Sequence, residues 1–288
     1  MQVSLPGKKE SSEMVTLTGK VAIVTGTSAP GGIGRAIAWR LAQDGAAVVL
    51  TDIDEPLETP DGAIGKAELL ALAVSELKAS GGTAAYFMAD VTKKENVQRC
   101  IEFAKARFGG VDILVNNAGS LAGSANILDT EPSQWEDSFL VNLLGPTMLS
   151  KAAIVEMRKT GSGSIVNIGS TKSLGAEAGF GAYTSMKHGL IGLTKTIAAE
   201  YGVDGIRCNA VCPGYINTEM HILANKKIAA NLNLSIEEVK ERRYANVALR
   251  SAGDPEDVAN AVAFLAGPES AYITGAVLPV AGGAPIGV

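Results

Sequence analysis

Seven short runs rich in valine and isoleucine recur along the chain, and stretches with helical character separate them. The runs are continuously apolar rather than alternating, which is typical of strands buried on both faces of a sheet. Regular alternation of strand and helix indicates parallel strands joined by right-handed crossovers. We therefore predict an α/β fold with a doubly wound, seven-stranded parallel sheet and helices on both faces. The predicted strands are residues 20–26, 46–52, 84–90, 111–117, 163–169, 206–212 and 275–281.

Local signals mark where several helices begin. Three segments match the Ser/Thr-x-x-Glu capping box, in which two side chains satisfy backbone N–H groups that the first turn leaves free. They are TKKE (92–95), SQWE (133–136) and SIEE (235–238). A fourth segment, DPED (254–257), places aspartate at the cap and proline at the first helical position.

The domain organisation is simple, because 288 residues without a linker suit one large α/β domain. We predict this domain over residues 17–288, after a flexible polar leader at 1–16. Residues 53–65 hold two prolines and two glycines, which predicts a surface loop after the second strand. Residues 217–247 are too many for a simple crossover and predict a lid-like helical insertion.

The charge balance excludes several classes of partner. A formal net charge of −5 gives no basic patch for nucleic acid or an anionic membrane surface. No apolar run approaches the roughly 18 residues that span a bilayer. The polar N-terminal segment lacks the apolar core of a signal peptide, so we expect a cytoplasmic protein.

The cysteine content argues against both disulfides and metal. The chain has three cysteines, Cys100, Cys208 and Cys212, and an odd, sparse count does not suit a disulfide framework. A zinc site built on the last two would need further ligands, and only His188 and His221 are available. We expect free, buried thiols that act as small hydrophobes, and no metal.

A glycine-rich turn follows the first predicted strand. Gly26, Gly32 and Gly34 would allow a tight turn and close approach to a pyrophosphate at a helix N-terminus. Asp52 ends the second strand, where a carboxylate can accept hydrogen bonds from an adenosine ribose and would repel a 2′-phosphate. This arrangement predicts NAD rather than NADP, although Arg35 just past the loop is a cation that could meet a phosphate.

Six motifs occur in order along the chain: TGTSAPGGIG (25–34), NNAG (116–119), VNLLG (141–145), NIGS (167–170), YTSMK (183–187) and CPG (212–214). Together they resemble the short-chain dehydrogenase/reductase family in its single-domain form, over about residues 17–283. The resemblance implies a Rossmann fold, a nicotinamide cofactor, a Ser-Tyr-Lys-Asn catalytic set and usually a homotetramer. Two departures are a glycine loop about two residues longer and Ala281 where the family commonly has aspartate.

The catalytic set follows from the resemblance and from helical spacing. Tyr183 and Lys187 are four residues apart, so on a helix they share a face. We expect the ammonium and a positive nicotinamide ring to lower the pKa of the phenol from about 10, so that Tyr183 acts as general acid and base. By resemblance, Ser170 hydrogen-bonds the substrate oxygen, Lys187 also holds the nicotinamide ribose, and Asn142 anchors a water linked to Lys187.

The resemblance also implies which residues contact the cofactor. Asp90 and Val91 meet the adenine, while the residues of NNAG line the cofactor and its asparagine braces the sheet. His188 faces another side of the helix from Lys187. The implied cofactor contacts are Gly26, Gly32, Ile33, Gly34, Asp52, Ile53, Asp90, Val91, Asn117, Ala118, Gly119, Tyr183, Lys187, Pro213, Gly214, Ile216 and Thr218.

The predicted substrate pocket is mostly apolar or small. Its segments are 120–128, 171–175, 178–181, Tyr215 and 220–223, with Lys172 and His221 as the only cations noticed. A small-molecule substrate that is a neutral, fairly hydrophobic secondary alcohol or its ketone is therefore predicted.

Three alternatives remain. A carrier-linked 3-oxoacyl reductase would use NADPH and a basic docking patch. A dehydratase or epimerase would produce no net NADH. A non-catalytic cofactor sensor would have no need of Ser170, Tyr183 and Lys187 together.

Overall fold

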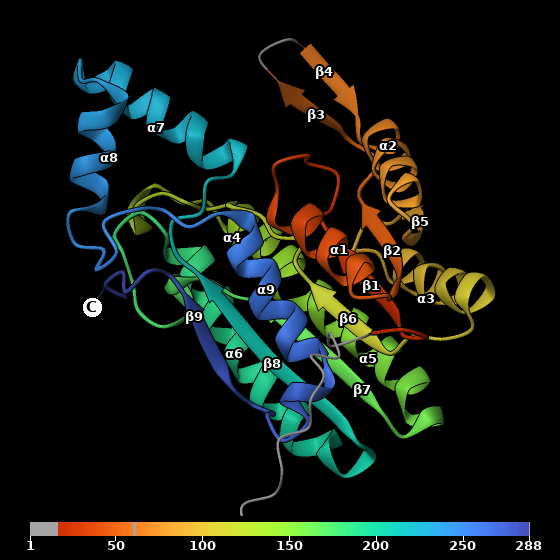
Figure 1. The fold of residues 1–288 in the computed structure, drawn as a ribbon. Coiled ribbons are helices and arrows are strands. Elements are labelled where there is room, and N and C mark those ends of the chain that lie inside the picture. Colours follow the sequence, from red (N-terminus) through yellow and green to blue (C-terminus); the bar gives the residue numbers. More distant parts are fainter. Residues whose placement is uncertain (1–16, 60–61, 288) are drawn as a thin grey trace, which may run out of the picture.

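A computed structural model describes residues 17–59 and 62–287 (Figure 1); the leader predicted for residues 1–16 lies outside this part. The main strands are β1 (Val21–Thr25), β2 (Ala47–Asp52), β5 (Thr83–Met88), β6 (Ile113–Asn116), β7 (Gly163–Ile168), β8 (Ile206–Pro213) and β9 (Val277–Val280). They form one sheet in the order β5-β2-β1-β6-β7-β8-β9, and every neighbouring pair is parallel. The predicted doubly wound sheet is confirmed, and each predicted apolar run overlaps one strand.

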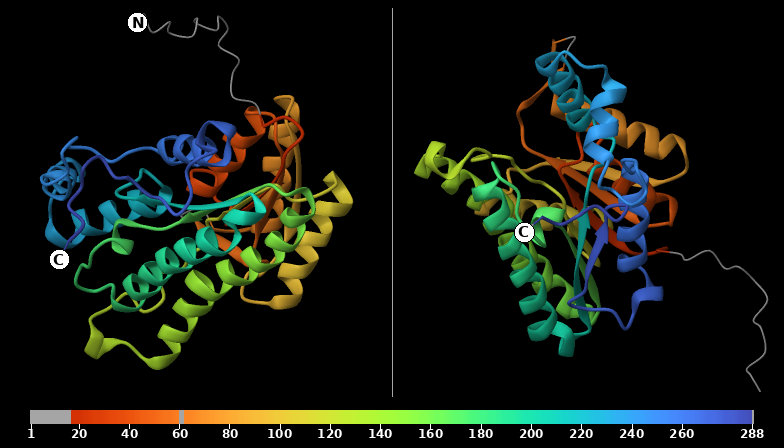
Figure 2. Two further views of the ribbon diagram at one scale, coloured as in Figure 1. Left: turned by 90° about the horizontal axis from the view of Figure 1, so that it is seen from below. Right: turned by 90° about the vertical axis from the view of Figure 1, so that its left-hand side faces the viewer.

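Helices cover both faces of this sheet (Figure 2). The α-helices are α1 (Ile33–Gln43), α2 (Lys66–Ala79), α3 (Lys94–Phe108), α4 (Pro132–Phe139), α5 (Gly145–Thr160), α6 (Gly181–Tyr201), α7 (Glu219–Leu232), α8 (Ile236–Tyr244) and α9 (Pro255–Ala266). Shorter turns include the π-helical η2 (Leu140–Leu144) and the 3₁₀ turns η1 (Ile127–Asp129), η3 (Thr171–Ser173), η4 (Gly202–Asp204) and η5 (Pro268–Ser270). α1, α2 and α9 bury one hydrophobic cluster against the sheet, and α3, α5 and α6 bury another on the opposite face.

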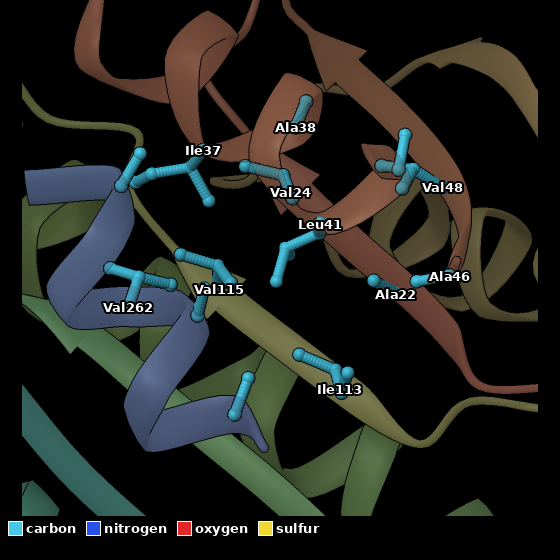
Figure 3. Close-up of a cluster of buried hydrophobic side chains, with 14 of the residues drawn as sticks. Ala22, Val24, Ile37, Ala38, Leu41, Ala46, Val48, Ile113, Val115 and Val262 are labelled. Atoms are coloured by element: carbon cyan, nitrogen blue, oxygen red, sulfur yellow. The ribbon is translucent and has the colours of Figure 1, made fainter. Parts of the chain in front are cut away.

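The two clusters together explain why the strands are apolar on both faces, and the first shows the packing in detail. Ile37 and Leu41 of α1 face Val24 and Val115 of the sheet, and Val262 of α9 lies beside them (Figure 3). All five side chains have no solvent exposure. Burying each of these side chains contributes about 1.5–3 kcal/mol relative to leaving it exposed. This packing therefore fixes β1 and β6, whose carboxyl ends border the cofactor cavity.

Two predicted helix starts are confirmed. Ser235 and Glu238 form a reciprocal capping box at α8. Asp254 and Asp257 form another at α9, with Pro255 at the first helical position. Both boxes satisfy backbone N–H groups locally, as the sequence predicts.

Two other helix starts are predicted wrongly. α4 begins at Pro132, and its capping box joins Glu131 to Gln134 rather than using SQWE. At TKKE, the Thr92 hydroxyl donates to Asp90 Oδ1 at 2.7 Å, and the cap of α3 has no side-chain hydrogen bond. At α4, the fixed φ of Pro132 suits the first helical position, so the helix begins before SQWE. At TKKE, Asp90 competes for the Thr92 hydroxyl.

The prediction of an irregular surface loop at 53–65 is also wrong, because this segment contains a β-hairpin. β3 (Pro56–Thr59) and β4 (Gly62–Gly65) pair antiparallel outside the main sheet. Pro56 is the first residue of its strand, a position where a missing N–H is tolerated. The pairing of Pro56 with Gly65 at the base returns the chain toward β2, so that Lys66 follows beside Asp52.

Residues 217–247 contain α7 and α8. These helices and the hairpin project at the same end of the molecule (Figure 1). Thr218 caps α7, because its Oγ1 accepts a hydrogen bond from the backbone N–H of His221 at 3.3 Å. That this segment acts as a lid stays a prediction.

One helical stretch, Pro132–Thr160, is long and apolar enough by length and composition to cross a membrane. It joins α4, η2 and α5. α5 buries Leu149, Ala153 and Met157 in the second hydrophobic cluster, on the sheet face opposite to α1 and α9. A core helix passes the same test, so this stretch supplies no argument for a membrane.

All three cysteines are free and buried, as predicted. Burial raises the pKa of Cys100 and of Cys208 to about 12, because a thiolate loses its hydration inside the protein. Within residues 17–59 and 62–287, no group of three or more His, Cys, Asp or Glu side chains could hold a metal ion.

Candidate active site and cofactor cavity

A cavity of about 760 Å³ opens at the carboxyl ends of β1, β2, β5 and β6. The order of the strands reverses between β1 and β6, and open α/β sheets bind ligands at such a point. The cavity wall also includes Leu57 of the hairpin and Met220 of α7. Among the residues predicted to contact the cofactor, the wall contains Gly26, Asp52, Ile53, Asp90, Val91, Asn117, Ala118 and Gly119.

Two glycines hold the β1–α1 loop against the end of β6. Gly26 has a φ of +70°, and a Cβ at Gly34 would lie 2.2 Å from the Gly26 oxygen and 2.5 Å from Asn117 Nδ2. Asn117 Nδ2 donates to the carbonyl oxygens of Thr25 at 2.8 Å and Gly26 at 3.0 Å. Only glycine fits at position 34. Asn117 was predicted to brace the sheet, and its bonds to Thr25 and Gly26 tie the end of β1 and the following loop to the end of β6.

Other predicted cofactor positions surround the cavity without lining it. Gly32 is the N-cap of α1, and Ile33 packs on the first core cluster. Gly214 lies against Ala281, the position that departs from the family pattern, since a Cβ at 214 would be 2.8 Å from the Ala281 Cβ. The predicted residues absent from the cavity wall are Gly32, Ile33, Gly34, Tyr183, Lys187, Pro213, Gly214, Ile216 and Thr218.

Asp52 lies in the cavity wall but is already fully engaged. Its Oδ2 accepts hydrogen bonds from the backbone N–H of Ser28 at 3.0 Å and from the Ser28 hydroxyl at 2.8 Å. Its Oδ1 accepts from the Ile53 N–H at 2.9 Å and lies 3.4 Å from the Lys66 ammonium. The carboxylate predicted to face the ribose therefore has a cationic neighbour, Lys66, that was not predicted from the sequence.

Arg35 points away from the cavity. Its guanidinium donates to the Leu69 carbonyl at 3.2 Å and lies 3.7 Å from Glu76 Oε2. It lines a separate groove of about 420 Å³ between α1, α2 and α9. The cation near Asp52 is thus Lys66, and the concern that Arg35 would meet a 2′-phosphate is removed.

The residues present fit a nicotinamide dinucleotide. The cap residue of α1 makes no side-chain hydrogen bond, so no side chain competes for the first backbone N–H groups of that helix, which suit a pyrophosphate. Small residues and carboxylates line the neighbouring cavity, and carboxylates such as Asp52 can accept hydrogen bonds from ribose hydroxyls. The cavity volume of about 760 Å³ lies within the range of cofactor sites.

α6 brings Tyr183 and Lys187 together, as predicted from their spacing. The Lys187 ammonium lies 5.6 Å from the centre of the Tyr183 ring and donates to the Ile168 carbonyl at 2.8 Å. Lys187 is only 4% exposed. Burial lowers its pKa to about 8, partly opposed by the nearby Cys212, because a buried ammonium loses hydration.

The expected lowering of the Tyr183 pKa is wrong for the chain by itself. Burial raises the pKa of Tyr183, although its hydrogen bond with Ser170 acts in the opposite direction. The cost of removing a phenolate from water outweighs that bond. Tyr183 therefore holds its proton at neutral pH, the state needed to protonate a carbonyl oxygen.

Ser170 stands just beyond β7, where a short turn fixes it. It caps η3, and its Oγ accepts a hydrogen bond from the Lys172 N–H at 3.2 Å. Its own N–H donates to Ser173 Oγ at 3.0 Å. These bonds hold the hydroxyl beside Tyr183.

Asn142 lies in the π-helical η2 and is completely buried. Its Nδ2 donates to the Ser120 carbonyl at 2.9 Å, and its Oδ1 accepts from the Ser120 N–H at 3.1 Å. A Cβ at Gly119 would lie 3.2 Å from Asn142 Oδ1 and 3.7 Å from the Lys187 ammonium. The catalytic set therefore borders the cavity at Gly119; the water predicted between Asn142 and Lys187 stays a prediction.

The pKa of Lys187 sets an expected pH dependence. Below about pH 8 Lys187 is charged and Tyr183 is protonated, which is the active form for carbonyl reduction. As the pH rises through about 8, Lys187 loses its proton and no longer favours the phenolate that forms during proton transfer. We expect kcat/KM for reduction to be level from pH 6 to 7 and to fall above pH 8. A profile that stays level to pH 9.5 would contradict this assignment.

Apolar side chains flank the catalytic residues on the predicted substrate side. Phe180 lies edge-on to Tyr183, with ring centres 6.4 Å apart. Leu121 and Ile127 of the 120–128 segment and Leu223 of α7 are substantially exposed. Lys172, one of the two cations predicted in the substrate pocket, forms an ion pair with Glu177.

The other cation, His221, belongs to an aromatic cluster between α7 and α8. Its Nε2 lies 2.7 Å from Tyr244 Oη, and burial, followed by Arg243, lowers its pKa to about 4. Arg243 lies 4.9 Å from the centre of the Tyr215 ring and donates to Asn225 Oδ1. His221 is therefore neutral at pH 7, and Arg243 is a cation near Tyr215 that sequence reasoning missed.

Sequence reasoning also missed the roles of three residues that shape the cavity. Thr25 Oγ1 accepts hydrogen bonds from the N–H groups of Asn117 and Ala118. Ser28 and Lys66 hold Asp52. The lengthened glycine loop was a signal for Ser28, but no pattern pointed to Lys66, since the hairpin that delivers it was not predicted.

Comparisons with known proteins agree with this geometry. A sequence family described as "Enoyl-(Acyl carrier protein) reductase" matches residues 26–285. The 3-oxoacyl-[acyl-carrier-protein] reductase FabG of Vibrio cholerae is 37% identical over 93% of this chain and 98% of that protein. The (3R)-3-hydroxyacyl-CoA dehydrogenase of Mus musculus is 38% identical over 94% of this chain and 98% of that protein.

Solved structures give the same result. An actinorhodin polyketide ketoreductase variant with NADPH has a TM-score of 0.82 at 33% identity, covering 92% of this chain and 96% of that one. An NAD⁺-bound xylitol dehydrogenase has a TM-score of 0.81 at 30% identity, covering 92% and 99%. These neighbours hold different nicotinamide cofactors. The seven-stranded sheet, the shared motifs and the near-complete coverage show that the chain belongs to the short-chain dehydrogenase/reductase family of oxidoreductases.

Proposed function

We propose that this protein is an NAD-dependent dehydrogenase that interconverts a neutral, fairly hydrophobic secondary alcohol and its ketone. The family assignment establishes an oxidoreductase of secondary alcohols and ketones with a nicotinamide cofactor; the choice of NAD and of substrate is the proposal. The observation that carries it is the Tyr183 phenol, hydrogen-bonded to Ser170 and 5.6 Å from the buried Lys187 ammonium at the border of the cavity.

In this mechanism the bound cofactor supplies or accepts the hydride. Tyr183 Oη donates its proton to the carbonyl oxygen in reduction and takes it back from the hydroxyl in oxidation. The Ser170 hydroxyl donates to the same oxygen as negative charge develops there. Lys187 stabilises the transient phenolate, and Asn142 holds the Gly119–Ser120 segment that separates Lys187 from the cavity.

The burial of Tyr183 makes reduction and oxidation depend differently on pH. A phenol with a raised pKa keeps its proton, so reduction needs no prior ionisation. Oxidation needs the phenolate, which the charged Lys187 and a positive nicotinamide ring would favour when both are present. The site can thus work in both directions, with oxidation favoured at higher pH until Lys187 is discharged.

The apolar surroundings support a neutral substrate. Leu121, Ile127 and Leu223 of the predicted pocket segments offer exposed apolar surface, and Ile127 lies against Gly181 at the start of α6. Lys172 is engaged by Glu177. Arg243 is engaged by Asn225 and by the Tyr215 ring. An uncharged, partly apolar alcohol would bury this surface without leaving an unpaired charge.

Asp52 supports the choice of NAD, because its carboxylate lies in the cavity wall at the end of β2, where we propose that the adenosine ribose binds. We expect wild-type protein to oxidise members of a panel of secondary alcohols with higher kcat/KM for NAD than for NADP. Asp52→Ala should lower that ratio by at least about tenfold, since a hydrogen bond to a charged group contributes about 1.5–3 kcal/mol. Asp54→Ala, which removes an exposed neighbouring acid, is the matched control. An unchanged ratio in Asp52→Ala would remove Asp52 from cofactor selection.

A second candidate substrate is a 3-oxoacyl thioester. It is favoured by the names of the relatives from Vibrio cholerae and Mus musculus, which act on acyl-carrier and CoA thioesters. Acetoacetyl-CoA assayed with NADH and with NADPH distinguishes this candidate from the alcohol panel. A cofactor sensor without turnover is disfavoured, because a binding protein has no need of Ser170, Tyr183 and Lys187 in this arrangement.

A further inference from the structure

The adenosine end of the cavity contains a charge pair rather than a single carboxylate. Lys66 Nζ lies 3.4 Å from Asp52 Oδ1, and the two side chains are 15% and 14% exposed. Both line the cavity, and Lys66 is the single Lys or Arg among the described residues of its wall. The nearby acids of the wall are Glu55 and Asp90, and Asp90 is turned onto Thr92.

The hydrogen bonds of Asp52 leave little of its acceptor capacity for a ribose. A carboxylate offers about four lone-pair positions. Three hydrogen bonds reach Asp52, two from Ser28 and one from the Ile53 N–H, and the Lys66 ammonium forms an ion pair with Oδ1 at 3.4 Å. A ribose hydroxyl must therefore compete with an existing partner. Lys66 is the partner that can move, because it holds the carboxylate through a flexible four-carbon chain.

The same pair changes what a 2′-phosphate would meet. An isolated Asp52 would repel the phosphate dianion, whereas an ammonium 3.4 Å away offsets that charge. Lys66 has three N–H donors, of which Asp52 uses one, and the Ser28 hydroxyl lies on the other carboxylate oxygen. An ammonium and a hydroxyl thus border the position where the carboxylate alone would exclude phosphate.

We propose that Lys66, delivered by the β3–β4 hairpin, is a cofactor-specificity residue that narrows the preference for NAD by admitting the 2′-phosphate of NADP. This inference rests on the proposed use of a nicotinamide cofactor at this cavity. Discrimination is the difference between two binding free energies, and Lys66 acts on both. It competes with the ribose for Asp52 in the NAD complex and it pairs with the phosphate in the NADP complex.

The test uses fragments that occupy only the adenosine end, so it does not depend on turnover. Calorimetry would measure the dissociation constants of adenosine 2′,5′-bisphosphate and of 5′-AMP for wild type and Lys66→Met. We expect the bisphosphate to bind at least about tenfold more weakly to Lys66→Met, which corresponds to the loss of one charge-assisted contact. Binding of 5′-AMP should be unchanged or tighter, and Lys66→Arg should retain bisphosphate binding.

Lys78→Met is the matched control, because it removes the same charge from an exposed position at the far end of α2. It should leave both dissociation constants unchanged. Equal weakening of both fragments by Lys66→Met would indicate a structural role and overturn the proposal, as would an unchanged ratio of the two constants. If neither fragment binds wild-type protein, the proposed cofactor site itself fails, which separates that failure from the failure of Lys66.

Discussion

Replacing Tyr183 with phenylalanine lowers the rate of carbonyl reduction by about 10³-fold, within the range that a positioned general acid contributes. The substitution removes one oxygen from a partly buried side chain and leaves its packing on Phe180 in place. Because the lost interaction acts on the reacting oxygen, we expect kcat to fall while the dissociation constant for the cofactor stays within about threefold. Single-turnover reduction and equilibrium cofactor binding measure the two quantities separately.

Tyr201→Phe is the control for this substitution. Tyr201 lies at the other end of the same helix, packed against the second hydrophobic cluster, and it should retain wild-type turnover. If Tyr183→Phe keeps more than about a tenth of the activity, proton transfer proceeds by another route and the proposed mechanism fails.

Gly34→Ala should have a large effect on the scaffold around the cavity. The added Cβ would lie 2.2 Å from the Gly26 oxygen and 2.5 Å from Asn117 Nδ2, so the β1–α1 loop must move away from β6. Overpacking costs roughly 1–3 kcal/mol, and we expect about 3 kcal/mol here because backbone atoms are involved. Cofactor affinity should fall at least tenfold, since each 1.4 kcal/mol of lost binding is about a factor of ten. Denaturant unfolding and cofactor titration measure both effects.

Gly110→Ala provides the comparison, because nothing lies within 4 Å of a Cβ at that position. Its stability should stay within about 0.5 kcal/mol of wild type. A Gly34→Ala protein as stable as Gly110→Ala, with unchanged cofactor affinity, would show that the close approach is not required.

The features that the sequence predicted well depend on short stretches of chain. Buried parallel strands are continuously apolar, so the sheet could be inferred run by run. The spacing of Tyr183 and Lys187 defines a helical face wherever the helix packs. The boxes at Ser235 and Asp254 satisfy their own backbone and need no distant partner.

The features that it missed depend on partners distant in the sequence or on burial. Lys66 reaches Asp52 only because the hairpin folds back. Arg35 is next to the glycine loop in sequence but is drawn to Leu69 and Glu76 of α2. The raised pKa of Tyr183 in the chain by itself was not predicted, because the spacing to Lys187 says nothing of how much water burial removes.

The burial of all three cysteines makes site-specific labelling of the chain practical. Thiolates are the reactive form of cysteine, and all three thiols of the chain are buried with raised pKa values. A cysteine introduced at an exposed position of α7 away from the cavity wall, such as Leu232, would therefore be the one readily labelled by a maleimide dye. A single fluorophore placed there would report directly whether the segment between β8 and α9 moves when a ligand arrives.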